Sequence, residues 1–268
     1  MKFEERARQE LTGVLRHYAS GNAEIVRTYF SRPRTREQDL AWIKRQAARE
    51  LTTAWKFLDN LVEFRPKFER EIRRRSYESL ARSFLEEIEH YRLFVELLEE
   101  EFQEKIVPEE LLAYGVWSED EGLPENAKKA RFERALRTSG NELAKIALGI
   151  GEGGGSGWLI AGSRIRGGRL EERIARVMGE VAADEMYHGP IHIAAAARRI
   201  RTEEELWTVR AILWEYLRHH LRMKNEQFGY PLSEERLAEI DAGQVEPLEG
   251  VDFSPVEHNR GEMAHYAL

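Results

Sequence analysis

Apolar residues recur at helical spacing along this chain, and single acidic residues interrupt several of the resulting stripes. Between positions 36 and 64 the stripe follows i, i+3, i+7 spacing, with Glu50 near its middle. Its apolar members are Leu40, Ile43, Ala47, Ala54, Phe57, Leu61 and Phe64. A carboxylate at such a position is expected to be buried, and a buried charge requires a partner or a metal ion.

Two later stripes contain an acid followed by a histidine. Glu87 interrupts the stripe formed by Leu80, Phe84, Tyr91, Phe94 and Leu98, and His90 follows one turn later. Glu185 interrupts the stripe of Ile174, Val177 and Val181, and His188 follows at the same spacing. Glu and His at i, i+3 share one helix face, so each pair can reach one metal ion.

The same periodicity, with its glycine and proline stops, predicts the helices. A helix over about 3–19 should end near Ser20-Gly21-Asn22, and a short helix should follow to Phe30. Longer helices are predicted over about 36–64, 70–104, 126–165 and 169–200, the third interrupted at a glycine run and the fourth kinked at Gly189-Pro190, just after His188. Two more are predicted over about 203–228 and 233–241, and no strand pattern is found.

The connection between the second and third long helices is long and contains Pro108, Gly115, Gly122 and Pro124. One long crossover is typical of the ferritin-like four-helix bundle. We therefore expect an all-α fold, a ferritin-like four-helix bundle with a long crossover and additional N- and C-terminal helices. The chain should form a single domain, 1–268, with the di-metal bundle core at 36–200, an N-terminal helical extension at 1–35, and a C-terminal helix and irregular tail at 201–268.

Hairpin geometry supports pairing of the acidic positions. Residues equidistant from the turn of an antiparallel helix pair lie at the same height. Glu50 and Glu87 are equidistant from positions 68–69, just after Arg65-Pro66, and Glu152 and Glu185 are equidistant from Gly167-Gly168. The unit of one Glu and one Glu-x-x-His therefore occurs twice, and its candidate metal ligands are Glu50, Glu87, His90, Glu152, Glu185 and His188.

Glu152 lies in the glycine-rich segment 149–157. Such a run predicts a bulge or a broken helix, and the missing side chains would leave room beside a metal for oxygen or an organic substrate. The alternative is that this segment is a loop and that Glu142 is the inward residue. Glu142 lies too far from Gly167-Gly168 to match Glu185, so Glu152 is preferred.

Several neighbouring residues are further candidates. Asp184 and Glu86 are candidate second-layer carboxylates, because metal-bound histidines usually donate their second N–H to such a group; we expect Asp184 to orient His90 and Glu86 to orient His188. His192 and Tyr187 are candidates for an extra ligand or a substrate contact. A third Glu-x-x-His, at 262–265, follows no apolar stripe and is interpreted as a chance occurrence.

Composition narrows the possibilities. The formal net charge of −7 is well mixed, which argues against a dedicated nucleic-acid binder. The sequence contains no Cys, which excludes disulfides, thiolate metal sites and a fused iron–sulfur or rubredoxin-type centre, so electrons would come from an external donor. The charged start and the lack of a long apolar run predict no signal peptide, no membrane partner and a cytoplasmic location.

With these six ligands and this helix order, residues 36–200 resemble the ferritin-like di-iron carboxylate superfamily. The resemblance implies two iron ions, with manganese or a mixed Mn/Fe pair as alternatives, and chemistry with O₂ or peroxide. It does not select a branch. The absence of Cys disfavours classical rubrerythrins. Phe94 occupies the position at which the small subunits of ribonucleotide reductase usually carry a radical tyrosine.

The hypothesis from the sequence is a di-iron carboxylate oxidase or oxygenase that uses O₂ to oxidise a small organic substrate. One alternative is a manganese catalase-like or ferroxidase activity, which needs no organic substrate. Another is a metal-free helical scaffold in which the inward acids pair with arginines such as Arg45 or Arg92. A homodimer is compatible with each of these functions.

Overall fold

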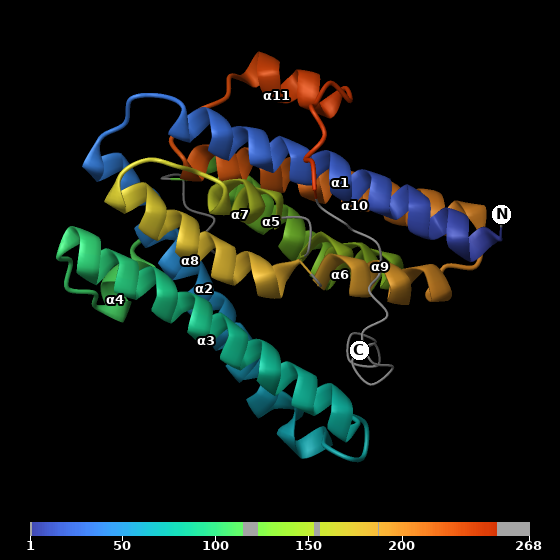
Figure 1. The fold of residues 1–268 in the computed structure, drawn as a ribbon. Helices are drawn as coiled ribbons and strands as arrows, with labels where there is room; N and C mark the ends of the chain where they lie inside the picture. The colour runs from blue at the N-terminus through green and yellow to red at the C-terminus, as the bar shows by residue number, and fades with distance from the viewer. Residues whose placement is uncertain (1, 115–122, 153–155, 187, 251–268) are drawn as a thin grey trace. The chain divides into compact units, whose positions relative to one another are not determined.

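The structure, a computed structural model, describes residues 2–114, 123–152, 156–186 and 188–250. These residues form an all-α protein (Figure 1), as the periodicity predicts, and their one β feature is an isolated bridge between Phe68 and Ile72. The ferritin-like arrangement is not established by this fold and stays a hypothesis. Among the described helices, none combines the length and the apolar character needed to cross a membrane.

The helices pack into two compact units. The first contains α1 (Phe3–Phe30) and the helices from α5 onward: α5 (Pro124–Thr138), α6 (Glu142–Glu152), α7 (Ser156–Ser163), α8 (Arg169–Glu185), α9 (His188–Arg199), α10 (Glu203–Gln227) and α11 (Glu234–Asp241). The second contains α2 (Arg36–Phe64) from Asp39 onward, a 3₁₀ turn (Arg65–Lys67), α3 (Arg74–Phe102) and α4 (Pro108–Leu112). The prediction of a single domain stays a prediction.

In the first unit, α1 packs against α7, α9 and α10, and α10 also packs against α5 and α6. Apolar residues of α1, including Leu11, Leu15 and Ile25, are fully buried there. The segments expected to be N- and C-terminal extensions are thus packed together with the segments expected to form the second half of the bundle.

Helix α1 is continuous, so the predicted break at Ser20-Gly21-Asn22 is wrong. Asn22 Nδ2 donates to the carbonyl oxygen of Tyr18 at 2.8 Å, and Ser20 Oγ donates to that of Arg16 at 2.8 Å, so both side chains bond to the backbone of their own helix. A Cβ at Gly21 would lie 3.1 Å from side chains of both Leu221 and Ile240. Gly21 therefore allows close packing against α10 and α11 and does not end a helix.

The segment expected to be a third long helix is divided more than predicted. Helix α5 ends at Thr138, Gly140 adopts a φ of 68°, and α6 begins at Glu142. A positive φ is readily adopted by glycine, which explains the stop. Helix α6 ends at Glu152 and α7 begins at Ser156, and the glycines between them, where an interruption was expected, lie outside the described residues.

The fourth helix breaks before His188, and not just after it as predicted. Helix α8 ends at Glu185 and α9 begins at His188. Pro190 consequently lies in the first turn of α9, where a missing backbone N–H leaves no intrahelical hydrogen bond unmade. Proline here starts a new helix and does not kink an existing one.

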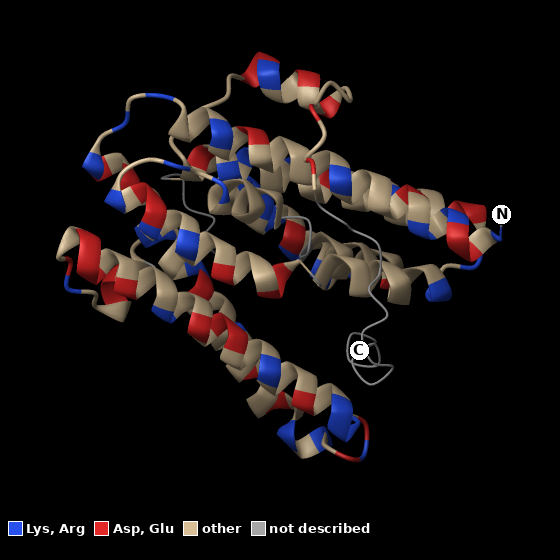
Figure 2. Ribbon diagram, in the orientation of Figure 1, with Lys and Arg blue, Asp and Glu red and all other residues tan. Residues whose placement is uncertain are grey.

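The second unit is built on an antiparallel helix pair, α2 and α3, which lie side by side in Figure 1. Near the turn, the Tyr77 hydroxyl donates to the carbonyl oxygen of Leu61 at 2.8 Å. At the other end, Lys44 pairs with Glu104 at 2.5 Å. Helix α3 begins at Arg74, four residues later than predicted, because residues 65–73 form the turn. Acidic and basic residues are mixed along the helices of both units (Figure 2).

Candidate metal site

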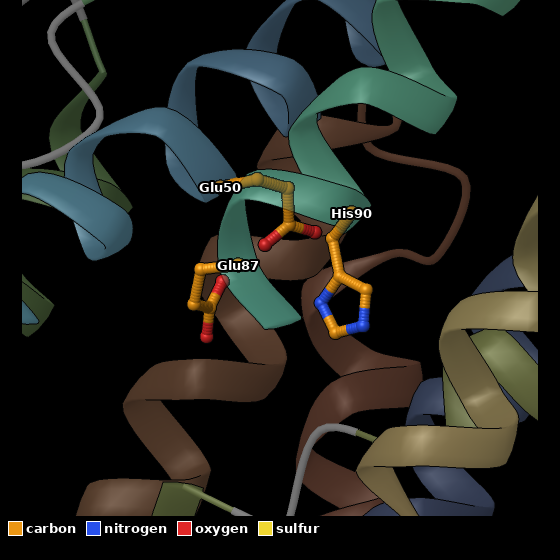
Figure 3. A group of neighbouring side chains, drawn as sticks. All are labelled: Glu50, Glu87 and His90. Carbon is orange, nitrogen blue, oxygen red and sulfur yellow. The ribbon is translucent and has the colours of Figure 1, made fainter. Parts of the chain in front are cut away.

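The helix pair of the second unit brings three of the predicted ligands together. Glu50 comes from α2, and Glu87 and His90 come from α3. One ligand atom from each lies within 4.8 Å of the others. Figure 3 shows the three side chains directed toward one another. The predicted pairing of Glu50 with Glu87 across the turn at 68–69 is therefore confirmed.

This group lies in the interior. Glu50 is 7% exposed and His90 is 1% exposed, while Glu87 is half-buried. The Glu87 Oε2 and His90 Nδ1 atoms are shielded from solvent. Apolar neighbours on the same helices, including Ala47, Ala54 and Phe94, are fully buried. Charged carboxylates in such surroundings require compensation by a cation or by hydrogen bonds.

Glu50 also receives a hydrogen bond that the sequence analysis missed. The Gln46 amide nitrogen, one helical turn earlier on α2, donates to Glu50 Oε1 at 2.6 Å, and both side chains are buried. A polar residue four positions before a buried acid lies on the same helix face, so the spacing was a usable signal.

The donor set suits a divalent transition metal. Two carboxylate groups and one imidazole are ligands that Fe(II), Mn(II) and Zn(II) accept. Within the described residues, no other group of three His, Asp or Glu side chains meets the same distance criterion. These three residues can therefore hold one metal ion.

Candidate ligands from the other half of the sequence lie in the first unit. His188 Nδ1 lies 3.3 Å from Glu185 Oε2, and their side chains are 19% and 20% exposed. The pair thus stays in contact although the helix breaks between its members. Glu152 is the last residue of α6, and its side chain lies outside the described set. Whether these residues share a centre with Glu50, Glu87 and His90 stays a prediction.

The register of the first unit differs slightly from the predicted one. A Cβ at Gly149 would lie 3.3 Å from His192 Nδ1, and Gly162 faces Met178. The midpoint of each pair along the sequence falls near Leu170, and not at Gly167-Gly168, the turn used in the prediction. The midpoint given by these two contacts differs from the turn used to pair Glu152 with Glu185, and that pairing stays a prediction.

Glu142 is the alternative ligand that the sequence offered in place of Glu152. Glu142 lies at the surface, where Lys145 at 2.6 Å and Arg199 at 3.2 Å pair with it. The hydrogen bond and the charge of Lys145 are the leading causes that lower the pKa of Glu142. The structure thus gives Glu142 basic surface partners, while Glu152 remains the preferred ligand of the sequence hypothesis.

The expected second-layer contacts stay predictions. Asp184 is exposed at the end of α8 and Glu86 is half-buried on α3, each in a different unit from the histidine assigned to it. His192 is half-buried on α9 against Gly149. Tyr187 and the third motif, Glu262 to His265, lie outside the described residues.

Arg92, one of the arginines considered as a partner for the inward acids, has other partners. Its guanidinium contacts Glu96 at 2.8 Å and Glu89 at 3.3 Å on the exposed face of α3. These ion pairs belong to the surface of the second unit.

Comparison of the chain with protein-family models, with curated proteins and with solved structures found no match to any of them.

Proposed function

We propose that this protein is a metal-dependent oxidoreductase of the di-iron carboxylate type, which oxidises a small organic substrate with O₂ or peroxide. The observation that supports the proposal is the buried group of Glu50, Glu87 and His90, whose ligand atoms lie within 4.8 Å of one another. Surface acids are common in this chain, but two carboxylates, one buried and one half-buried, that converge with a buried imidazole form an arrangement that a metal ion would stabilise.

Charge sets the number of ions that this group can hold. Two ionised carboxylates and one neutral imidazole carry a charge of −2, which balances one divalent cation. A second divalent ion requires about two more carboxylates for the same balance. Glu152 and Glu185 are the candidates from the sequence, with His188 as the second imidazole, and they extend the proposal from one ion to two.

The protein residues have defined roles in this proposal. Glu50 and Glu87 neutralise the ion, His90 supplies a nitrogen ligand, and the apolar neighbours exclude bulk water. A bound Fe(II) or Mn(II) supplies redox chemistry toward oxygen or peroxide. Where the reaction needs reducing electrons, they would come from an external donor, because the sequence contains no Cys for a fused iron–sulfur or rubredoxin-type centre.

The first experiment tests the three-residue group. The full-length apoprotein is titrated anaerobically with Fe(II) and Mn(II), and bound metal is measured by elemental analysis. Glu87→Gln and His90→Asn should abolish tight binding at this position. The matched control is Glu89→Gln, which changes an exposed acid on the same helix and should leave binding intact. Full metal content in both site variants would overturn the proposal.

The second experiment tests the extension to two ions. Glu185→Gln and His188→Asn are compared with Glu180→Gln, a change at an exposed position of the same helix α8. Two metals per wild-type chain, reduced by either site variant but not by the control, support a di-metal centre. One metal per chain, unaffected by these variants, restricts the centre to Glu50, Glu87 and His90.

The oxidoreductase assignment is tested by the optical spectrum of the Fe(II) protein before and after exposure to air. New absorption that develops in the wild-type protein and not in Glu87→Gln supports it. A metal-loaded protein that shows no change with O₂ or peroxide contradicts it.

A further inference from the structure

A hydrogen bond between two buried side chains joins Gln46 to Glu50 at the candidate metal site. The amide nitrogen lies 2.6 Å from Glu50 Oε1, and the two residues are 5% and 7% exposed. We infer that Gln46 is a positioning residue, which fixes how the Glu50 carboxylate presents itself to a divalent metal. This inference rests on the proposed metal site.

The amide is suited to this role because it is neutral. A lysine or arginine at position 46 would satisfy the charge of Glu50 directly and compete with a metal ion for it. A glutamine amide donates a hydrogen bond but leaves the charge of Glu50 available to a cation. Gln46 therefore holds the carboxylate without replacing the metal.

The contact also restricts the geometry of Glu50. One turn of α2 separates the two residues, so the amide approaches from the same helix face and limits rotation of the carboxylate. Because the amide occupies one acceptor site of Oε1, it would limit the orientations in which the carboxylate can be offered to a metal ion. Loss of the amide would free Glu50 to rotate or to bind through both oxygens, which changes the coordination of the ion.

The experiment uses Co(II), which reports coordination through its visible spectrum, added to the full-length apoprotein. Gln46→Leu keeps approximate volume and removes the donor, and Gln46→Asn keeps an amide but shortens its reach. Both should bind Co(II) about 10–100-fold more weakly than the wild type, in the range found when partners of metal ligands are removed. Their ligand-field bands should also differ from those of the wild type.

A control separates positioning from loss of stability. Leu98→Val trims a fully buried residue of α3, two turns beyond His90, and lowers the stability of the same helix pair without touching the ligands. Leu98→Val should keep the wild-type affinity for Co(II) and the wild-type spectrum. This should hold even if its melting temperature falls as far as that of Gln46→Asn.

Each outcome has one meaning. If the wild type binds Co(II) and both Gln46 variants bind it with unchanged affinity and spectrum, the inference is wrong while the metal site stands. If Leu98→Val loses affinity to the same degree as the Gln46 variants, the effect is structural and the inference is also wrong. If the wild type binds no Co(II), Fe(II) or Mn(II), the proposed metal site itself fails.

Discussion

Gly157 on α7 lies directly against the backbone of Ala19 on α1, so that a Cβ at position 157 would overlap the Ala19 carbonyl group. Backbone atoms of a long helix cannot move aside as a flexible side chain can. We therefore expect Gly157→Ala to lower the free energy of unfolding by about 3 kcal/mol or more, as measured by urea denaturation.

Gly13 provides the opposite case on the same helix. It is exposed in the interior of α1, and a Cβ there would meet no atom within 4 Å. Gly13→Ala should raise the free energy of unfolding by about 0.5–1 kcal/mol, because alanine restricts the unfolded chain without strain in the helix. Equal effects of the two substitutions would contradict the close approach of α7 to α1.

Metal binding should stabilise the protein. A ligand that binds only the folded state adds about 2.7 kcal/mol at a free concentration one hundred times its dissociation constant. Thermal or urea unfolding with and without Mn(II) measures this gain. The gain should disappear in Glu87→Gln and persist in Glu89→Gln. Equal stabilisation of both variants would indicate that Mn(II) acts elsewhere on the protein.

His17 should make stability depend on pH below neutrality. Burial lowers the pKa of His17, against weaker opposing effects of a hydrogen bond to the Ile240 backbone and the charge of Asp241. Below the ordinary pKa of about 6.5, the unfolded chain gains a proton that the folded chain resists. Stability should therefore fall as the pH drops through 6.5 toward the lowered pKa, and His17 should contribute no pH dependence above that range.

His17→Phe should reduce this loss, because phenylalanine can keep the stacking on Trp214, whose ring lies 5.0 Å away, and cannot be protonated. Unfolding free energies at pH 7.5 and 5.5 measure the difference. Burial also lowers the pKa of His219, so part of the pH dependence should remain in this variant. An unchanged slope in His17→Phe would show that His17 stays exposed to protons when folded.

Glu226 should stabilise the start of α5. Its carboxylate accepts hydrogen bonds from the backbone N–H groups of Glu125 at 3.0 Å and Asn126 at 2.9 Å, and from the Tyr230 hydroxyl at 2.8 Å. Glu226→Gln removes the charge and turns an N–H group toward these donors, so it should cost about 2 kcal/mol or more. Glu204→Gln, an exposed change on the same helix, should stay within about 0.5 kcal/mol of the wild type.

The sequence predicts the helices best where a long apolar stripe has clear ends. Helix α2 begins and ends as expected, and the pairing of Glu50 with Glu87 follows from one turn and a constant rise per residue. Both results depend on local spacing alone, which explains why they could be obtained without coordinates.

Features that depend on contacts between distant segments were harder to predict. In the sequence, Gly21 has the appearance of a helix stop. Its role in packing against Leu221 and Ile240 was not visible there, because these residues lie some two hundred positions away. The break before His188 was misplaced because proline is compatible with both a kink and a first helical turn. Gln46 was not predicted because the candidate residues were chosen by charge or metal-binding ability, and Gln46 is an uncharged hydrogen-bond donor.

The interruption between α8 and α9 has a mechanical consequence for the pair formed by Glu185 and His188. Glu185 is the last residue of α8 and His188 is the first residue of α9, so the two side chains belong to different helices. A change in the angle between these helices would alter the 3.3 Å separation of His188 Nδ1 and Glu185 Oε2 without breaking a hydrogen bond inside either helix. The separation of these two potential ligands therefore depends on how α8 and α9 are set relative to each other, and not on the geometry of a single helix.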